Sequence, residues 1–391
     1  MCDLGETFGI LSAGGDSVTR RCVKCRFSHS EKLPALDKRV IYLDQFAFSE
    51  LFKLKSGNRR TDAHTDFWVE ADQLITRVLL LQQAIFPASE VHHSETIVSA
   101  WPVELRHAYE AMGGDVRLED TNIIQLRQVR AFADAYISGT PVALDFDIDS
   151  VIRGKRNAWL TDMRISLSTD YSQFADATRA SVAETAGEIA NLMAQWRRMG
   201  YGFDEVLEIE LGSYQASRLE ALAHFAKRHQ EAVASGDFMA ELNVGMSSIV
   251  KEMSLMRDVL SRAGVPVDRH DEEINGFWCW EGNRDQPFGR ILAYMFAALA
   301  GQVKAGRIKP PTPGFMNDVK VLGAYAPYVD AMFVDNECAT LLSQGRPRDE
   351  LTYRARIFSL NTKNDFLEYL KVLEASASGE VRRQAESIYG A

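Results

Sequence analysis

A short apolar run that ends in an acidic residue constrains the fold of this chain more than any other feature. The run Val-Ile-Tyr-Leu occupies positions 40–43, and Asp44 follows it directly. A continuous apolar run of this length is typical of a strand buried on both faces of a parallel sheet. An aspartate at the carboxyl end of such a strand faces the crevice where open α/β sheets bind ligands. Asp44 is therefore either a functional residue or the N-cap of a helix that begins at Gln45.

The next segments repeat this order of strand and helix. Apolar residues at three- and four-residue spacing across 67–81 predict a long amphipathic helix. The short apolar piece 84–86 predicts a second strand, and Ser89 is placed to cap a further helix that carries Glu95. This order indicates an α/β fold that begins as a parallel, doubly wound sheet.

The chain beyond these elements divides into a helical part and a mixed part. Residues 146–285 contain long helical patterns and few strand-like runs, so we interpret them as a mostly α-helical insertion. The apolar run 331–334 and the piece "RARIFSL", 354–360, predict two more strands. We expect an N-terminal segment with a C-x-x-C motif at 1–37 and the first half of an α/β domain at 38–145. The helical insertion follows at 146–285, and the second half of the domain at 286–391.

Acidic residues recur at the ends of the predicted strands and helices. Asp335 ends a strand run as Asp44 does, Asp318 precedes the helix that leads into that run, and Glu95 lies early in its own helix. Because the carboxyl ends of parallel strands share one edge, these side chains should converge there and repel one another unless a cation joins them. Oxygen ligands favour Mg²⁺ or Mn²⁺, which can activate a water molecule for phosphodiester hydrolysis.

These residues resemble the PIN domain, a nuclease fold with sparse acidic residues at strand and helix ends. "VIYLD" looks like its first strand with the first aspartate, and "HHSET" looks like the helix with its glutamate. The stretch "ND…AYAPYVDAMFVDN" is similar to its closing aspartate, helix, strand and last aspartate. The resemblance covers roughly 38–145 and 286–375, and the inserted helical stretch departs from compact family members.

The resemblance implies a three-layer α/β/α PIN-like domain with a parallel sheet, interrupted by the helical insertion. It also implies that Asp44, Glu95, Asp318 and Asp335 are the catalytic, metal-binding acids of a Mg²⁺- or Mn²⁺-dependent nuclease. The expected activity is hydrolysis of phosphodiester bonds by an endoribonuclease. The alternative is a non-catalytic PIN-like scaffold that binds nucleic acid or protein partners, and retention of all four acids favours the enzyme.

Four further residues are candidates for supporting roles at this site. Ser89 is expected to cap the helix behind the site, Asn336 to contact substrate or a metal-bound water, and His93 to contact substrate or transfer a proton. Asp330 is an additional acid, although its position at the start of a strand predicts that it lies at the opposite edge of the sheet. An exposed helix explains His93 equally simply.

The N-terminal segment offers a second, weaker metal motif. Cys22 and Cys25 form a C-x-x-C, with His29 four residues later and Cys2 near the start of the chain. These four residues could bind Zn²⁺, but a second C-x-x-C is absent, and a flexible segment with free thiols is the alternative. Cys338 follows Asp335 closely, yet no Cys–His–acid spacing supports a nucleophile, so we interpret it as a core thiol.

The overall charge limits how this chain can bind nucleic acid. The formal net charge is −10, so RNA binding requires local basic patches and metal ions. Lys and Arg are concentrated in four stretches, which are 20–26, 55–60, 153–157 and 346–356. The expected partner is a nucleic acid substrate, RNA rather than DNA, with the helical insertion available to a protein partner. Neither a signal peptide nor an 18-residue apolar run is present, which predicts a cytoplasmic protein without membrane contact, and the sequence does not indicate the oligomeric state.

Overall fold

Four parallel strands form the central sheet of the protein. The computed structural model describes residues 9–22, 24–160, 172–245 and 247–390. The sheet has the order β5-β4-β8-β9, and all three pairs of neighbours run parallel. Its strands are β4 (Arg39–Leu43), β5 (Ala84–Ile85), β8 (Ala331–Phe333) and β9 (Arg356–Phe358). The prediction of four parallel strands in one sheet is therefore confirmed, although three of the strands are shorter than their apolar runs.

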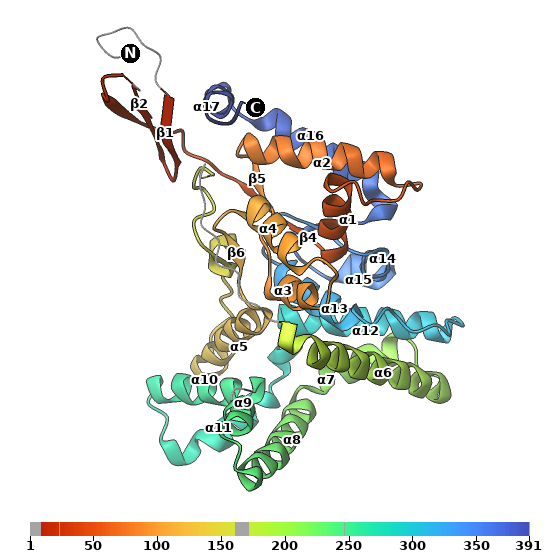
Figure 1. Cartoon of the computed structure of the whole chain (residues 1–391). Coiled ribbons are helices and arrows are strands. Elements are labelled where there is room, and N and C mark those ends of the chain that lie inside the picture. The colour runs from red at the N-terminus through yellow and green to blue at the C-terminus, as the bar shows by residue number, and fades with distance from the viewer. Residues whose placement is uncertain (1–8, 23, 161–171, 246, 391) are drawn as a thin grey trace.

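Side chains alternate between two hydrophobic cores along β4. Val40 and Tyr42 join one core, while Ile41 and Leu43 join the other, so the strand is buried on both faces as its unbroken apolar run predicts. The first core is covered by α12 (Pro287–Lys304) and α13 (Phe315–Tyr325). The second is covered by α1 (Gln45–Lys55), α2 (Thr65–Leu80) and α16 (Lys363–Ser376). Helices thus flank a small parallel sheet, as Figure 1 shows, and the α/β class is confirmed.

Shorter elements complete the sheet region. After β5 the chain forms α3 (Glu90–Ile97), α4 (Pro102–Gly113) and α5 (Thr121–Ser138), and after β8 come α14 (Asn336–Ser343) and α15 (Gly345–Glu350). The chain closes with α17 (Gly379–Tyr389). A small antiparallel pair, β6 (Arg117–Leu118) with β7 (Ile152–Arg153), connects the segment before the helical insertion to its first residues.

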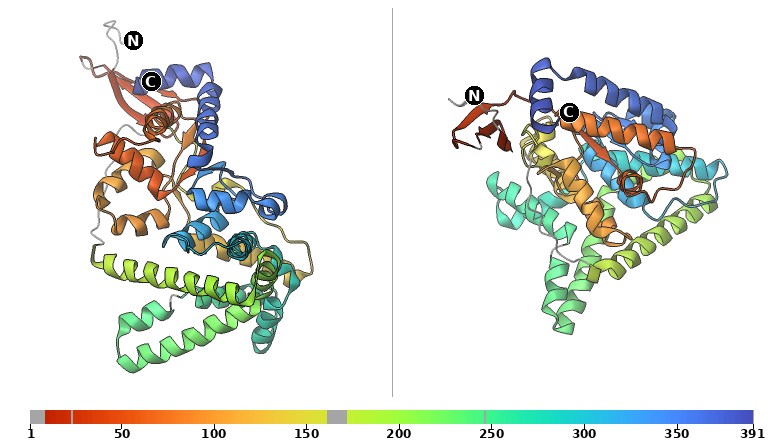
Figure 2. Two further views of the ribbon diagram at one scale, coloured as in Figure 1. Left: turned by 90° about the vertical axis from the view of Figure 1, so that its right-hand side faces the viewer. Right: turned by 45° about the horizontal axis from the view of Figure 1, so that its top comes forward.

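The stretch 146–285 is mostly helical, as predicted. Its helices are α6 (Ala175–Met199), α7 (Phe203–Gly212), α8 (Tyr214–Ser235), α9 (Phe238–Gly245), α10 (Ser248–Arg262) and α11 (His270–Trp278). Figure 2 shows that the green and teal helices of this stretch lie at the end of the molecule remote from both termini. Their short 3₁₀ connections are η1 (Ile148–Val151), η2 (Ser172–Phe174), η3 (Val267–Arg269) and η4 (Glu281–Asp285), and η5 (Leu360–Thr362) follows β9.

Two helices from outside this stretch join it to the rest of the protein. On α5, Val129 and Phe132 share a hydrophobic core with Met256 and Leu260 of α10. On the other side, α12 packs against α6 and α7 within the core that also covers the sheet. The helical stretch is therefore continuous with the α/β part through shared cores.

The N-terminal segment forms a three-stranded antiparallel sheet over residues 9–32. The sequence analysis offered a zinc site or a flexible segment here and did not predict strands. Its strands are β1 (Gly9–Gly14), β2 (Ser17–Arg21) and β3 (Ser28–Lys32). Figure 1 shows this sheet at one margin of the molecule, beside α17. Val18 packs with Trp159 and Val381 in a small core. Because the sheet is mostly polar, with a small buried apolar face, its strands gave little signal in the sequence.

Within the described residues, no helix is both long enough and apolar enough to cross a lipid bilayer.

Candidate metal centre

Asp44 directly follows β4, and Asp335 lies two residues beyond the end of the neighbouring strand β8. The last residues of those strands, Leu43 and Phe333, are register partners, and the Asp44 N–H donates to the Phe333 carbonyl at 2.9 Å. Each aspartate then begins a helix, α1 after Asp44 and α14 after Asp335. The parallel register therefore places both carboxylates at the carboxyl edge of the sheet, as the sequence predicted.

Both aspartates also accept hydrogen bonds at the start of their helices. Asp44 Oδ1 accepts from the Gln45 N–H at 2.6 Å, and Asp335 Oδ1 accepts from the Cys338 N–H at 2.6 Å. The capping role and the functional role are thus compatible, because each carboxylate uses one oxygen for the helix and keeps the other for a ligand.

The other two predicted acids reach the same edge from different helices. Asp318 lies in the first turn of α13, and its carboxylate lies within 4.8 Å of both the Asp335 carboxylate and the Cys338 thiol. Glu95 lies on α3, where its Oε1 accepts from the Asn317 side-chain amide at 3.4 Å. Because Asn317 directly precedes Asp318, this contact joins α3 to the start of α13.

The electrostatics show how strongly these carboxylates act on one another. Burial raises the pKa of Asp44 to about 8, and repulsion from Glu95 and Asp335 adds to the effect, while the hydrogen bond from Gln45 opposes it. Burial also raises the pKa of Asp318 well above its usual range, with contributions from Asp44, Asp335 and Glu95. The pKa of Glu95 is raised by burial, and Asn317 opposes that shift. The structure brings all four predicted acids into one mutually repelling group.

The donor set fits a hard divalent cation. Four half-buried carboxylates supply oxygen ligands, which Mg²⁺ and Mn²⁺ prefer, and a cation would remove the repulsion that raises their pKa values. The nearby Cys338 thiol is a poor ligand for such an ion, because burial and the adjacent Asp335 and Asp318 raise its pKa and keep it protonated. Cys338 is a buried thiol of α14, in line with its interpretation from the sequence.

A buried histidine that the sequence analysis did not assign to the site fixes the helix that carries Glu95. His92 is fully buried, and its Nε2 donates to the Leu43 carbonyl at 2.7 Å while its Nδ1 accepts from the Ser89 N–H at 2.9 Å. Burial lowers the pKa of His92 to about 3, so the ring is neutral and these two bonds define its tautomer. Ser89 caps α3 as expected, its Oγ accepting from the His92 N–H at 3.4 Å.

A polar chain beside Glu95 also went unrecognised in the sequence. The Tyr109 hydroxyl donates to Gln45 Oε1 and lies 2.8 Å from the Thr96 hydroxyl. Gln45 follows Asp44 and Thr96 follows Glu95. These hydrogen-bonded side chains therefore connect the residues next to two of the acids. Adjacency to a predicted acid was the only available signal for Gln45, Thr96 and Asn317, and Tyr109 had no such signal.

Two supporting candidates do not contact the four acids. The Asn336 side chain is exposed and its Oδ1 accepts from the Asn361 N–H at 3.0 Å, so it holds η5 against α14. The His93 Nε2 atom is buried and has no hydrogen-bond partner in the described chain. Burial and the nearby Arg117 and Arg106 lower the pKa of His93.

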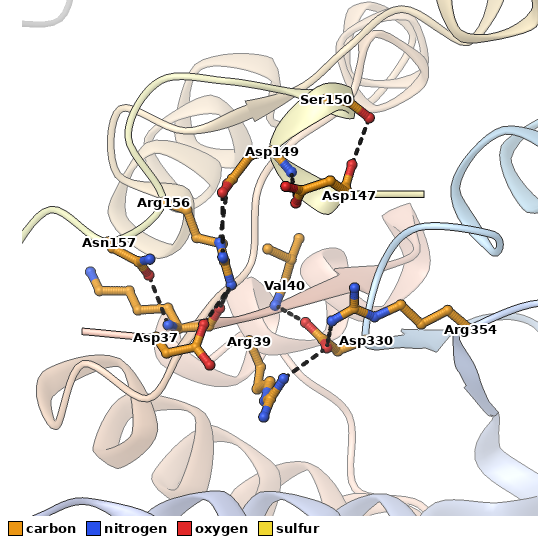
Figure 3. A network of polar contacts seen from close by, with 11 residues as sticks. Asp37, Arg39, Val40, Asp147, Asp149, Ser150, Arg156, Asn157, Asp330 and Arg354 are labelled. Atoms are coloured by element: carbon orange, nitrogen blue, oxygen red, sulfur yellow. Dashed lines mark hydrogen bonds and ion pairs between the residues drawn. The ribbon is translucent and has the colours of Figure 1, made fainter. Parts of the chain in front are cut away.

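Asp330 lies at the opposite edge of the sheet, as its position at the start of β8 predicted. Its Oδ2 accepts from the Val40 N–H at 2.9 Å, and its Oδ1 accepts from Arg39 at 3.3 Å and Arg354 at 2.7 Å. Figure 3 shows these contacts beside a second network around Arg156, which binds Asp149 and Asp37. Asp330 therefore anchors the amino edge of the sheet and is no part of the acidic group.

The predicted zinc ligands are only partly assembled among the described residues. Cys22 is buried and Cys25 is exposed in the turn between β2 and β3, whereas His29 lies on β3 opposite Arg20. Within the part of the chain that the structure describes, these residues form no group of three ligands close enough to share an ion. Cys2 lies outside the described residues.

No protein-family model, no curated protein and no solved structure matches this chain.

Proposed function

We propose that the protein is a metal-dependent nuclease of the PIN-like type that hydrolyses phosphodiester bonds, with RNA as its substrate. The supporting observation is the convergence of Asp44, Glu95, Asp318 and Asp335 at one sheet edge from four separate segments. Such a group is costly without a cation, and the helix caps formed by Asp44 and Asp335 do not explain why Glu95 and Asp318 join them.

The four carboxylates would hold one or two Mg²⁺ or Mn²⁺ ions. A bound ion supplies Lewis-acid chemistry, since it lowers the pKa of water and stabilises charge on a phosphodiester. Glu95 Oε1 is occupied by the Asn317 amide, so Oε2 is the oxygen free to bind an ion or to accept a proton from the attacking water. His92 and Ser89 act through α3, because they fix the helix on which Glu95 lies.

Several features favour RNA hydrolysis over the non-catalytic scaffold. A scaffold that binds RNA or protein would have no need for four converging carboxylates, which repel phosphate groups. The acidic net charge of −10 adds to that repulsion, so substrate approach requires cations. The choice of RNA over DNA rests on the resemblance to PIN nucleases, and the cytoplasmic location stays a prediction from the sequence.

The test is the turnover of a labelled single-stranded RNA by the wild-type chain and by Asp44→Asn, each with Mg²⁺, Mn²⁺ or EDTA. We expect cleavage by the wild type with either ion, none with EDTA, and a loss of about 100-fold or more in Asp44→Asn. Asp349→Asn is the matched control, because Asp349 is exposed and forms its ion pair with its sequence neighbour Arg348. Equal rates for wild type and Asp44→Asn, once contaminating nucleases are excluded, would refute the proposal.

A further inference from the structure

Three arginines gather at the amino edge of the sheet, opposite the acidic group. Arg39 begins β4, Arg354 precedes β9 and Arg356 begins it. Arg39 and Arg354 share a single oxygen of Asp330, whose other oxygen accepts from a backbone N–H. Figure 3 shows the two guanidinium groups reaching Asp330 from different segments. We call Arg39, Arg354 and Arg356 the arginine patch.

The arginine patch carries more positive charge than its surroundings neutralise. Asp330 is the only carboxylate in the described chain that forms an ion pair with any of the three. The Arg356 guanidinium lies 5.2 Å from the ring centre of Phe358 and 5.0 Å from that of Tyr369, within cation–π range. One carboxylate among three guanidinium groups leaves a local excess of positive charge.

The same three groups act together on one phenol. Burial raises the pKa of Tyr369 to about 12 and Asp330 adds to this shift, whereas Arg39, Arg356 and Arg354 oppose it. All three guanidinium groups therefore lie near the Tyr369 hydroxyl. Their side chains remain accessible, with 42% of Arg39 and 40% of Arg354 exposed.

This arrangement matches the chemistry of a phosphate group. A guanidinium presents planar pairs of N–H donors that fit phosphate oxygens. Among the described residues, Arg39 and Arg354 each use one terminal nitrogen on Asp330. In a chain of net charge −10, three accessible arginines that share a single carboxylate partner form a local positive site that can attract a polyanion.

We propose that the arginine patch binds backbone phosphates of an RNA strand whose cleaved bond lies at the acidic group. This inference rests on the proposed nuclease function for the choice of RNA. Asp44 lies five positions after Arg39, directly beyond β4, so the two sites lie about 17 Å apart along the strand direction. The outer strand β9 runs from the arginine patch toward the carboxyl edge and gives the RNA a direction along the protein. A dinucleotide could reach only one of the two sites.

The structure also gives a reason why the arginine patch can be altered without unfolding the protein. Arg354 and Arg356 are exposed, and Asp330 keeps its bonds to Arg39 and to the Val40 N–H when both are replaced. The variant for the test is therefore Arg354→Gln with Arg356→Gln in the full chain, and its melting temperature checks the fold.

The experiment measures binding of a labelled single-stranded RNA of about ten nucleotides, in EDTA so that no cleavage occurs, across a range of salt concentrations. We expect the double variant to bind about tenfold more weakly, with a salt slope smaller by about 0.7 for each lost phosphate contact. Arg257→Gln with Arg262→Gln is the matched control, since it removes the same charge from exposed arginines that have carboxylate partners. Unchanged affinity and slope in the double variant would overturn the inference.

Two further measurements separate this inference from its alternatives. Inorganic phosphate and a mononucleotide should displace the RNA only at much higher concentrations than competing RNA does. If they displaced it at similar concentrations, the ligand would be a small phosphate compound and the inference would be wrong. If RNA binding depends on the arginines but no RNA is cleaved, the nuclease proposal is refuted and the arginine patch is still supported. If the double variant cleaves long RNA with an unchanged Michaelis constant, the nuclease proposal is supported and the role of the arginine patch is refuted.

Discussion

Asp44 and Asp335 have almost the same backbone conformation, with φ and ψ of −66° and 158° for Asp44 and −62° and 159° for Asp335. Each follows one of two hydrogen-bonded parallel strands and begins a helix. The geometry that caps the two helices thus also brings two carboxylates to one edge. The two carboxylates repel each other, and this repulsion lowers the stability of the fold until a cation binds or one carboxylate is protonated.

The metal-free protein should lose stability as the pH rises, and Asp44→Asn should lose less. The pKa of Asp44 is raised from 3.8 to about 8 in the folded state, so its contribution is present below the unfolded pKa and disappears as the pH rises through the folded one. The free energy of unfolding should fall by up to about 1.4 kcal/mol per pH unit for this group. Urea titrations in EDTA at several pH values measure the slope, and the same slope in both proteins would contradict the assignment.

Removing the Cys338 side chain should leave RNA turnover unchanged. The thiol is buried and its pKa is raised, so it serves neither as nucleophile nor as ligand to a hard cation. Cys338→Ala should cost about 1 kcal/mol of stability through lost packing. A large fall in turnover with an intact fold would show that the thiol takes part in the reaction.

Asn317 should act on metal affinity through Glu95. Its amide donates to Glu95 Oε1, so Asn317→Ala removes the contact that orients this carboxylate. We expect the affinity for Mn²⁺ to fall about tenfold with little change in melting temperature. Calorimetric titration with Mn²⁺ measures the effect, and Asn361→Ala is the control because Asn361 lies beside α14 and engages Asn336 through its backbone N–H. Equal Mn²⁺ affinities of wild type and Asn317→Ala would rule out the orienting role.

His92 should make the protein sensitive to acid. Its pKa falls from 6.5 to about 3 on folding, so its contribution is complete above pH 6.5 and is lost as the pH decreases toward 3. His92→Gln should be less stable at neutral pH but lose stability less steeply on acidification, by up to about 1.4 kcal/mol per pH unit. The acidic group changes the unfolding free energy with pH in the opposite direction, but equally in wild type and His92→Gln, so the difference between their two slopes reports His92 alone. Equal slopes in the two proteins would contradict the prediction.

Asp330→Ala should destabilise the sheet by about 3 kcal/mol. The substitution leaves the buried Val40 N–H without its acceptor and places Arg39 and Arg354 beside each other without a carboxylate. Asp349→Ala, at an exposed position, should change stability by less than about 0.5 kcal/mol. Urea denaturation of the two variants gives the comparison, and similar small losses would show that the contacts at the amino edge contribute little.

The sequence predicted the sheet and the acidic group because local patterns determine both. Unbroken apolar runs at 40–43 and 331–334 identify buried parallel strands, and an aspartate after each run marks their common edge. The β5 strand is shorter than its run because the Phe86 N–H bonds to Met112 instead of continuing the ladder. Such a departure depends on packing, which no local pattern records.

The supporting contacts could not be predicted, because they join residues far apart in the chain. Asn317 meets Glu95 across 222 positions, and Gln45 meets Tyr109 across 64. His92 lies in the run "HHSET" with Glu95, but its bond to the Leu43 carbonyl depends on how α3 packs on β4. The N-terminal sheet escaped notice because its strands present few apolar side chains.

The distance in sequence between the two central strands has a consequence during synthesis of the protein. Val40 and Asp330, which join β4 to β8, are 290 positions apart. A ribosome must therefore translate most of the chain before β4 can pair with β8, and pairing at such separation is slow. Asp44 is synthesised long before Asp318 and Asp335, which complete the acidic group. A nascent chain would thus lack the complete acidic group until Asp335 has been translated and β8 has paired with β4.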